Sequence, residues 1–381
     1  MLNCQKHLFN LSEDVTYLNC ATMSPFLQSV ERIGIENLKR KTNPQHIESH
    51  HFFTDRKILK ERFAALIGAP DPDSVSIIPS VSYGIATVTK NIPFNKGDEI
   101  IVLEDQFPSN IYAWKQVEQE KEISITTILA PPLSEGRGKL WNERLIEAIS
   151  NRTKVVAIPQ VHWSDGTFFD LKAIRKKLNE FGAYLIIDGT QSIGAIPFSI
   201  PDIAPDALIC GGYKWMLGAY GLGMAYYSER FYQGSPLEDN WINHKGSEDF
   251  TNLASYNPEF KPKATRFDVG ESSNFILVPM LAEAIQQIID WRPERIQDYC
   301  RDITADGIKS LRDHGYFIED PDFRAQHLFG IFCTGKRSMK EIKQILTLEN
   351  IKVSFRGQSI RISPHLYNTR ADIEKLVNCF I

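Results

Sequence analysis

Short apolar runs alternate with segments of helical periodicity between about residues 50 and 230. The segments Arg56–Ile67 and Leu171–Phe181 place apolar residues on one helical face, and Ser24 followed by Pro25 predicts the N-cap and first position of an earlier helix. Strands separated by amphipathic helices predict a mainly parallel sheet covered on both faces. The runs that predict its strands are Val75–Ile78, Glu99–Leu103, Ile123–Leu129, Val155–Val161, Tyr184–Ile187, Ala207–Cys210 and Gly223–Tyr227.

The pattern changes towards the C-terminus, where strands and helices no longer alternate. The long helical stretches Leu277–Trp291 and Pro293–His314 come first. This α+β pattern predicts a second domain, and we expect a large α/β domain over residues 26–275 and a smaller one from residues 1–25 and 276–381. The other elements predicted for the smaller domain are strands at Tyr316–Ile318, Leu328–Cys333, Lys352–Phe355 and Ile360–Ile362, and a helix from about Thr369.

The composition argues against several classes of protein. The chain has 381 residues with 43 basic and 47 acidic side chains, so no excess of positive charge predicts a nucleic-acid-binding face. Its six cysteines are scattered without a Cys-x-x-Cys pair, which argues against a disulfide framework or a cysteine zinc site. No stretch resembles a signal peptide or the ~20 apolar residues of a membrane span. We expect a soluble, cytoplasmic protein without nucleic-acid or membrane partners, and we assign no metal ligands.

Three motifs carry residues suited to chemistry. In LIIDGTQS, Asp188 ends a buried strand at the edge where open α/β sheets bind ligands, although it could simply cap the next turn. In ALICGGYKWMLG, Lys214 lies among apolar residues that would lower the pKa of its amine, although it could be a surface lysine in a glycine-rich turn. In SIIPSVSYG, Ser80 and Ser82 open a helical segment whose N-terminus either binds an anion or is merely capped by serine.

Together, these motifs predict a site for pyridoxal phosphate. A lysine can form a Schiff base with this cofactor, a carboxylate can keep its pyridine nitrogen protonated, and a helix N-terminus can hold its phosphate. A nicotinamide-dependent dehydrogenase is the alternative that the GAYGLG string would favour. That string enters a predicted strand rather than a helix, which is a poor match to a dinucleotide loop.

The sequence resembles the class V branch of fold type I pyridoxal-phosphate enzymes, which includes cysteine desulfurases, kynureninases and isopenicillin N epimerase-like proteins. The resemblance runs from YLNCATMSP at residues 17–25 to SIRISPHLYNT at residues 359–369. It implies an α/β fold in which a mostly parallel seven-stranded sheet lies between helices in a large domain, with a smaller α+β C-terminal domain. It also implies a homodimer with shared active sites that acts on an amino acid or another carboxylate-bearing amine.

The resemblance implies a role for each residue that matches a family motif. Lys214 corresponds to the lysine that forms the aldimine with the cofactor and then acts at the substrate α-carbon, through a carbanion or quinonoid. Asp188 would pair with the pyridine nitrogen, and Gln191 would hydrogen-bond the ring 3-oxygen. Ser82 and the backbone N–H of Val81 would bind the phosphate.

Aromatic residues and arginines complete the implied site. Tyr213 precedes the lysine, as in kynureninase-like members, and its hydroxyl would contact the phosphate. Phe107, in EDQFPSN, would stack on the cofactor ring, and Trp163 would lie beside it. Arg361 matches the arginine that binds the substrate α-carboxylate, with Arg356 as a second candidate for substrate binding.

Several positions depart from the family pattern. Gly211 stands where many relatives have a phosphate-binding serine, and Gly270-Glu271 replaces the Gly-Thr of desulfurases. Glu271 would repel a phosphate, so we assign the contact with the partner subunit's phosphate to the residues that follow it, Ser272, Ser273 or Asn274, and of these we favour Ser272 and Asn274.

The largest departure is the absence of a cysteine from KVSFRGQSIRIS, residues 352–363, where desulfurases carry a nucleophilic thiol on a loop. The sequence therefore favours an epimerase-, lyase- or aminotransferase-type reaction. The alternatives are a C–S lyase similar to cysteine desulfurase or selenocysteine lyase, and a catalytically silent binding protein with the same fold.

Overall fold

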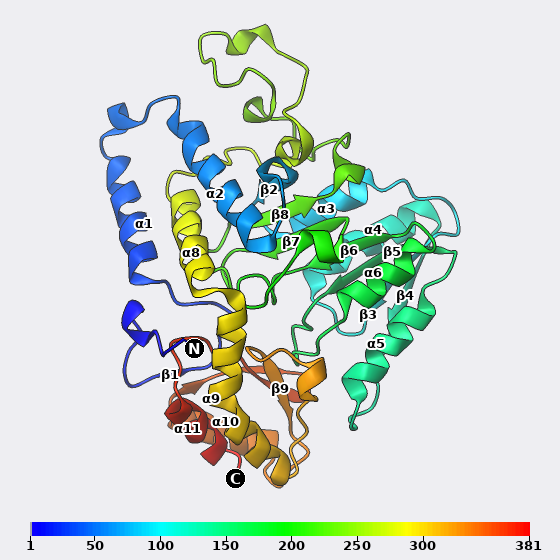
Figure 1. Cartoon of the computed structure of the whole chain (residues 1–381), viewed down its shortest axis with the longest axis vertical. Coiled ribbons are helices and arrows are strands. Elements are labelled where there is room, and N and C mark those ends of the chain that lie inside the picture. Colours follow the sequence, from blue (N-terminus) through cyan, green and yellow to red (C-terminus); the bar gives the residue numbers. More distant parts are fainter. Residues whose placement is uncertain (1) are drawn as a thin grey trace.

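Seven strands form one sheet at the centre of the structure (Figure 1). The computed structural model describes residues 2–381. The strand order is β2-β8-β7-β6-β5-β3-β4, in which β8 runs antiparallel to both of its neighbours and the other neighbouring pairs are parallel. The prediction of a mostly parallel seven-stranded sheet is confirmed. Its strands are β2 (Val75–Ile78), β3 (Glu99–Leu103), β4 (Ser124–Ile128), β5 (Thr153–Pro159), β6 (Tyr184–Asp188), β7 (Ala207–Gly211) and β8 (Gly223–Tyr227).

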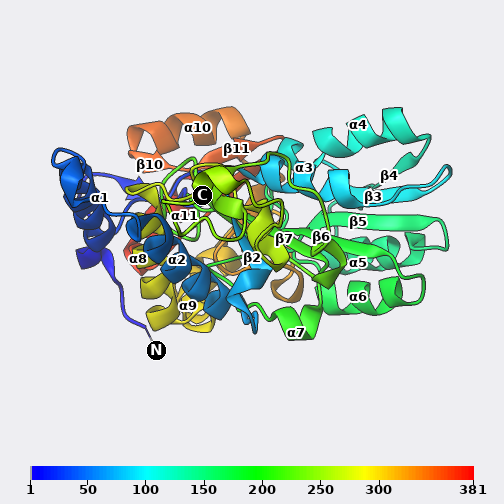
Figure 2. The same cartoon turned by 90° about the horizontal axis from the view of Figure 1, so that it is seen from above.

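Helices cover both faces of this sheet, as Figure 2 shows. On one face lie α3 (Val81–Asn91) and α4 (Tyr112–Lys121), and on the other lie α5 (Arg137–Ala148), α6 (Leu171–Asn179) and α7 (Ile200–Ile203). Every residue of β3, β6 and β7 is buried, because side chains on both faces of these strands meet a helical layer. The continuous apolar character that predicted these strands thus follows from two-sided burial.

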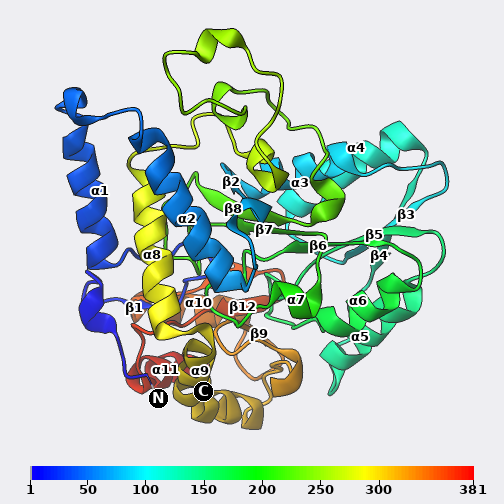
Figure 3. The same ribbon diagram turned by 45° about the horizontal axis from the view of Figure 1, so that its top comes forward.

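Three long helices pack side by side next to β2 (Figure 3): α1 (Gln28–Arg40), α2 (His51–Ile67) and α8 (Leu277–Trp291). α8 leads through Arg292 directly into α9 (Pro293–Asp313). Among residues 2–381, no helix combines the length and apolar character needed to cross a bilayer. Short 3-10 turns occur at Lys6–Leu8, Pro44–His46, Pro72–Ser74, Pro108–Asn110, Glu229–Phe231, Trp241–Asn243, Leu253–Ser255, Lys263–Phe267 and Pro321–Phe323.

A smaller group of elements lies below the large sheet in Figure 1 and includes α9. β11, β12 and β9 form an antiparallel sheet in that order, and β1 from the N-terminal segment pairs in parallel with β10. The division into domains of residues 26–275 and of residues 1–25 with 276–381 stays a prediction. The remaining elements are β1 (Thr16–Tyr17), β9 (Phe329–Phe332), α10 (Met339–Leu348), β10 (Ile351–Lys352), β11 (Ser354–Arg356), β12 (Ser359–Ile362) and α11 (Arg370–Asn378).

The predicted helix start at Ser24 and Pro25 is wrong, because α1 begins only at Gln28. Ser24 instead binds the loop after β7. Its backbone N–H and its hydroxyl both donate to the Tyr213 carbonyl, at 3.1 and 3.2 Å. The Ser24 hydroxyl, which was expected to cap the helix, therefore makes a tertiary hydrogen bond instead.

Two strand predictions in the C-terminal part also need correction. Tyr316–Ile318 forms no strand, only an isolated bridge between Phe317 and Phe332, and the backbone N–H of Phe317 donates to the Thr334 hydroxyl (2.9 Å). The run Lys352–Phe355 is divided between β10 and β11, because these strands pair with different partners, β1 and β12. The sequence shows the apolar runs, but it does not show which strands pair with one another.

Gly194 supplies a test of how tightly the loop after β6 packs against the segment that contains Lys214. Its φ is +99°, and a Cβ there would overlap the Trp215 carbonyl oxygen. We expect Gly194→Ala to lower the free energy of unfolding by about 3 kcal/mol or more, from backbone strain plus overpacking. Gly97→Ala is the control: its φ is +87° but no atom lies within 4 Å of the added Cβ, so only strain of about 1–2 kcal/mol is expected. Urea denaturation measures both, and equal losses would contradict the tight packing.

Candidate active site

Eight of the predicted site residues meet in one cavity at the C-terminal ends of β6 and β7: Val81, Ser82, Phe107, Trp163, Asp188, Gln191, Tyr213 and Lys214. The cavity has a volume of about 200 Å³. Parallel strands that end at the same edge of a sheet bring these distant residues together. The other lining residues are Pro79, Ser80, Gln106, Ser109, Pro159, Val161, Thr190, Gly211, Tyr220, Gly221 and Leu222.

Asp188 ends β6 with a buried carboxylate. It is only 7% exposed, and one of its oxygens accepts a hydrogen bond from the Thr190 backbone N–H (3.0 Å). Burial raises its pKa, since the nearby Lys214 compensates only partly for the lost hydration. Among residues 2–381 no lysine, arginine or histidine forms an ion pair with this carboxylate. A cationic N–H group in the cavity would therefore be bound strongly and would restore the ionised form.

Lys214 places an amine in the same cavity. The residue is 6% exposed, and its Nζ lies 5.2 Å from the centre of the Phe107 ring and 5.4 Å from that of Tyr213. Burial lowers the pKa of Lys214 to about 8; the Arg361 guanidinium acts in the same direction and Asp188 opposes it. At slightly alkaline pH a large part of the amine is thus uncharged and able to act as a nucleophile or base.

The N-terminus of α3 offers a place for an anion. Ser80 is the N-cap, and its hydroxyl accepts a hydrogen bond from the Tyr83 N–H (3.2 Å). The backbone N–H groups of Val81 and Ser82 have no acceptor among the described residues, and both residues line the cavity. The Ser82 hydroxyl lies 2.9 Å from that of Ser80. Free N–H groups at the positive end of a helix favour a phosphate.

Gln191 is held at three points on the wall of the cavity. Its side-chain oxygen accepts a hydrogen bond from the Trp215 indole (2.8 Å), and its amide donates to the Ala21 carbonyl (3.2 Å). Its backbone carbonyl lies 2.8 Å from Nε2 of His327. The second hydrogen of the Gln191 amide has no acceptor among residues 2–381, so it is available to a ligand in the cavity.

Two pairs of aromatic rings line the opening. Phe107 and Trp163 lie nearly perpendicular, with centroids 5.4 Å apart, and Tyr213 and Tyr220 form a similar pair at 4.6 Å. A Cβ on Gly211 would come within 3.0 Å of the Tyr213 ring. The glycine that departs from the family pattern therefore makes room for this tyrosine.

Arg361 and Arg356 both contact Trp163. Arg361 is 1% exposed and donates to the Trp163 carbonyl (2.7 Å) and to the Thr22 hydroxyl (2.6 Å). The guanidinium of Arg356 lies over the Trp163 ring, 5.3 Å from its centroid. Burial lowers the pKa of Arg361 to about 9. Among residues 2–381 neither arginine has an acidic partner, and the Nε atom of each is buried without an acceptor. Two unpaired guanidiniums favour an anionic ligand.

Ser272 and Asn274 lie outside this cavity. Ser272 is buried, and its hydroxyl has no partner among the described residues, whereas the Asn274 side chain caps the start of α8. In the same loop, Glu271 is exposed with a φ of +57°, and the Gly270 N–H donates to the Glu238 carboxylate. The assignment of Ser272 and Asn274 to the partner's phosphate stays a prediction.

Three contributors were missed or left without a role. Thr190 joins the ends of two strands: its N–H binds Asp188, and its hydroxyl accepts from the Gly211 N–H (3.1 Å). The Asp-x-Thr spacing within DGTQS could have revealed it, because this spacing is typical of a turn closed by the aspartate side chain. Thr22 and His327 had no local signal, since each contacts the site only through the tertiary fold.

The cavity fits pyridoxal phosphate on three separate observations. The free N–H groups at the start of α3 suit its phosphate, the unpaired Asp188 suits its protonated ring nitrogen, and the buried Lys214 amine suits its aldehyde. These features lie in one cavity rather than at separate places. A single ligand can therefore satisfy all three.

Comparisons with known proteins identify the family of this chain. The family model described as Aminotransferase class-V matches residues 16–376. YcbU of Bacillus subtilis, an uncharacterized aminotransferase, is 26% identical over 319 residues, which cover 84% of this chain and 81% of that protein. A kynureninase of Bacillus thuringiensis is 24% identical over 359 residues, which cover 91% and 80%.

Solved structures share the fold. A lysine-to-alanine mutant of C-DES, with glycine covalently linked to the PLP cofactor, has a TM-score of 0.85 at 17% identity and covers 98% of each chain. The cysteine desulfurase CsdA of Escherichia coli has a TM-score of 0.81 at 18% identity and covers 98% of this chain and 96% of its own. The fold predicted from the motifs is confirmed. Because the family match spans nearly the whole chain, this protein belongs to the class-V aminotransferase family of enzymes and uses pyridoxal phosphate as its cofactor.

Proposed function

We propose that this enzyme binds an amino acid through its α-carboxylate at Arg361 and removes the proton from the α-carbon with Lys214. The observation that carries the proposal is the buried Lys214 amine, whose pKa is lowered to about 8, in a cavity next to two arginines without acidic partners. Bound pyridoxal phosphate supplies the electron sink that makes loss of an α-proton feasible. An uncharged amine with a pKa near the working pH is well suited to accept that proton.

The remaining residues position the reactants. Arg361 has a planar guanidinium anchored by the Trp163 carbonyl and the Thr22 hydroxyl, which fixes the direction in which it can present N–H groups to a carboxylate. Phe107, which packs against Trp163, lies next to the Lys214 amine and helps to keep it desolvated. If a second donor protonates the α-carbon on the face opposite to Lys214, the enzyme is an epimerase. If the proton is delivered to the cofactor instead of to the substrate, the enzyme is an aminotransferase. If the substrate loses a group from its β-carbon, the enzyme is a lyase.

The β11–β12 hairpin favours these reactions over desulfurase chemistry, although some relatives carry the name probable cysteine desulfurase. Arg356 pairs with Ser359, so the turn between the strands consists of Gly357 and Gln358 alone, and Gly357 has a φ of +54°. Such a tight turn leaves no loop to carry a thiol. None of the cysteines lines the cavity, and burial raises the pKa of Cys20, which lies near Lys214, to about 12.

We also infer a homodimer with shared active sites. Phe52, Trp241 and Phe250 form an aromatic cluster with ring centroids 5.5–5.9 Å apart, and Trp241 and Phe250 are 41% and 38% exposed. Phe52 belongs to α2, whereas Trp241 and Phe250 belong to the long segment between β8 and α8, which projects at the top of Figure 1. Exposed aromatic clusters of this kind are typical of protein interfaces. The adjoining loop carries Ser272 and Asn274, whose side chains do not serve the cavity of their own chain.

Lys214→Ala tests the role of the lysine. In D2O, the wild-type enzyme should exchange the α-proton of at least one D- or L-amino acid in a panel, as followed by NMR. Loss of the base should slow that exchange by about 10²–10⁴-fold. Lys172→Ala removes a lysine that is 64% exposed and should exchange at the wild-type rate. A Lys214→Ala enzyme that still exchanged at the normal rate would refute the proposal.

Arg361→Lys should instead raise the half-saturating substrate concentration by about 10–100-fold, the effect of losing a charge-assisted hydrogen bond. The exchange rate at saturation should fall less than this, because Lys214 stays in place. An unchanged half-saturating concentration would place the substrate carboxylate elsewhere.

Mixed dimers test whether the sites are shared. One subunit carries Lys214→Ala, and the other carries Ser272→Ala with Asn274→Asp, in which the aspartate keeps an oxygen to cap α8. Each variant alone should be inactive or nearly so. Coexpressed, they should regain activity, because one site then combines Lys214 of one subunit with Ser272 and Asn274 of the other. A mixture no more active than its components, or a fully active monomer by light scattering, would argue against shared sites.

A further inference from the structure

Two side chains from the smaller part of the chain reach the loop that follows β6. Gln297 lies on α9, and His327 lies just before β9. Gln297 donates to the Ala195 carbonyl (2.8 Å), and His327 contacts the Gln191 carbonyl (2.8 Å). The two side chains also contact each other, with Nε2 of Gln297 2.8 Å from Nδ1 of His327. The loop that carries Gln191 is thus held by a half-buried glutamine and a buried histidine from another part of the fold.

The hydrogen-bond pattern determines the tautomer of His327. Gln297 Oε1 accepts from the backbone N–H of Gln326 (3.1 Å), so the amide nitrogen is the atom that faces Ala195 and His327. Because this nitrogen donates, Nδ1 of His327 must accept. The ring proton therefore lies on Nε2, which donates to the Gln191 carbonyl.

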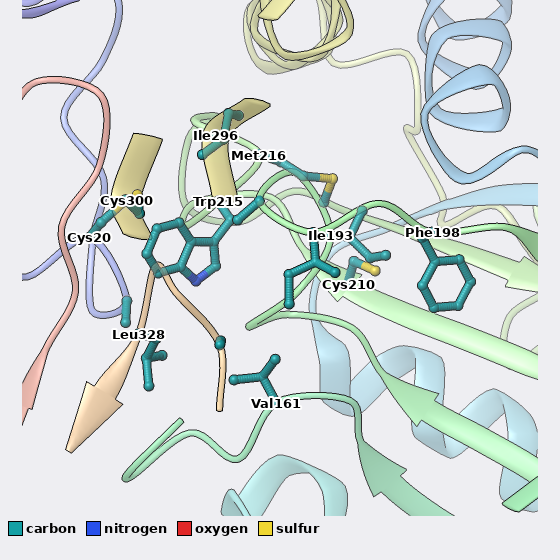
Figure 4. Packing of buried hydrophobic residues seen from close by; sticks show 14 of the residues in the cluster. Cys20, Val161, Ile193, Phe198, Cys210, Trp215, Met216, Ile296, Cys300 and Leu328 are labelled. Carbon is teal, nitrogen blue, oxygen red and sulfur yellow. The ribbon is translucent and has the colours of Figure 1, made fainter. Parts of the chain in front are cut away.

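The surroundings keep this imidazole neutral. His327 is fully buried, and burial lowers its pKa to about 4. Its ring lies perpendicular to that of Trp215, with the centroids 4.3 Å apart, and the His365 ring lies 5.9 Å from the same indole. Figure 4 shows Trp215 reaching from the loop after β7 between Leu328 and Ile193. The donor and acceptor sides of His327 thus stay defined at neutral pH.

We propose that Gln297 and His327 are positioning residues that orient Gln191 as a hydrogen-bond donor to the cofactor. His327 holds the main chain of Gln191, Trp215 holds its side-chain oxygen, and Ala21 takes one amide hydrogen. Only the second amide hydrogen is left, on a side chain that lines the cavity. This inference rests on the role of Gln191 in the cofactor site. It adds that two residues from the smaller part of the chain orient the donor, and we call the chain of contacts from Gln297 through His327 to Gln191 the relay.

His365 offers a matched control. It is as fully buried as His327 and packs against the same Trp215, but neither of its ring nitrogens has a hydrogen-bond partner among the described residues. Replacing it therefore removes a buried imidazole of equal size without removing a contact to Gln191.

Titration of each apoprotein with pyridoxal phosphate, followed by absorbance, is the test. His327→Phe should weaken cofactor binding about tenfold, the effect of one ordinary hydrogen bond, and should move the visible band of the bound cofactor. His327→Gln keeps a terminal N–H donor and should restore both. His365→Phe should change thermal stability but not the band. Wild-type affinity and an unmoved band in folded His327→Phe would overturn the proposal, as would an equal shift in His365→Phe.

The variant Gln191→Leu distinguishes a failure of this inference from a failure of the assignment of Gln191 to the cofactor site. If Gln191→Leu leaves binding and the band unchanged, the assignment of Gln191 itself fails. If Gln191→Leu alters them and His327→Phe does not, only the relay fails.

NMR of the apoprotein labelled with ¹⁵N-histidine gives a readout independent of the cofactor. The chain has nine histidines, and the signals that are absent from the spectrum of His327→Gln identify His327. At neutral pH these signals should be those of the Nε2–H tautomer. A Nδ1–H tautomer or a charged ring at pH 7 would contradict the relay.

Discussion

Desolvation of the Lys214 amine at the ends of β6 and β7 is the constraint on which the site depends. Helical layers on both faces of the sheet keep water from these strands, and Phe107 and Tyr213 close over the amine. The same burial raises the pKa of Asp188. Both shifts favour uncharged groups in the free cavity, while the start of α3 presents free N–H groups to it and two arginines without acidic partners lie beside Trp163. Such a cavity is prepared for an anionic cofactor and an anionic substrate.

The two parts of the fold contribute differently to this cavity. The large sheet supplies Asp188, Lys214 and the start of α3, which are the groups suited to the cofactor. The smaller part supplies Arg361 from β12, together with the Gln297–His327 pair that holds the loop after β6. If Arg361 binds the substrate carboxylate as we propose, contacts between the parts determine where that carboxylate and the cofactor ring lie relative to the amine.

Much of the fold could be predicted because strands buried on both faces leave a continuous apolar signal. Val75–Ile78, Glu99–Leu103 and Gly223–Tyr227 match β2, β3 and β8 at both ends. Shorter elements in the smaller part were less predictable. α10 went unrecognised although Ser338 and Glu341 form a capping box at its start, and β10 and β11 were joined because their partners could not be seen in the sequence.

The candidate site was predicted where its residues belong to local motifs and missed where they do not. Asp188 ends a strand and Lys214 follows one, each within a recognisable motif, and the two motifs together with the start of α3 predicted a pyridoxal phosphate site. Thr22 and His327 act through contacts with residues far away in the sequence, so no local pattern identifies them. The reaction type depends on where Lys214 delivers a proton, which rests on geometry around a bound substrate.

Reductive trapping of pyridoxal phosphate on the apoprotein tests the central claim most directly. After borohydride treatment over a range of pH, peptide mapping by mass spectrometry locates the adduct. The account predicts an adduct on Lys214 alone, with a yield that rises through a midpoint near pH 8 as the amine loses its proton. An adduct on other lysines, or a midpoint near the value of about 10.4 of an ordinary lysine, would contradict it.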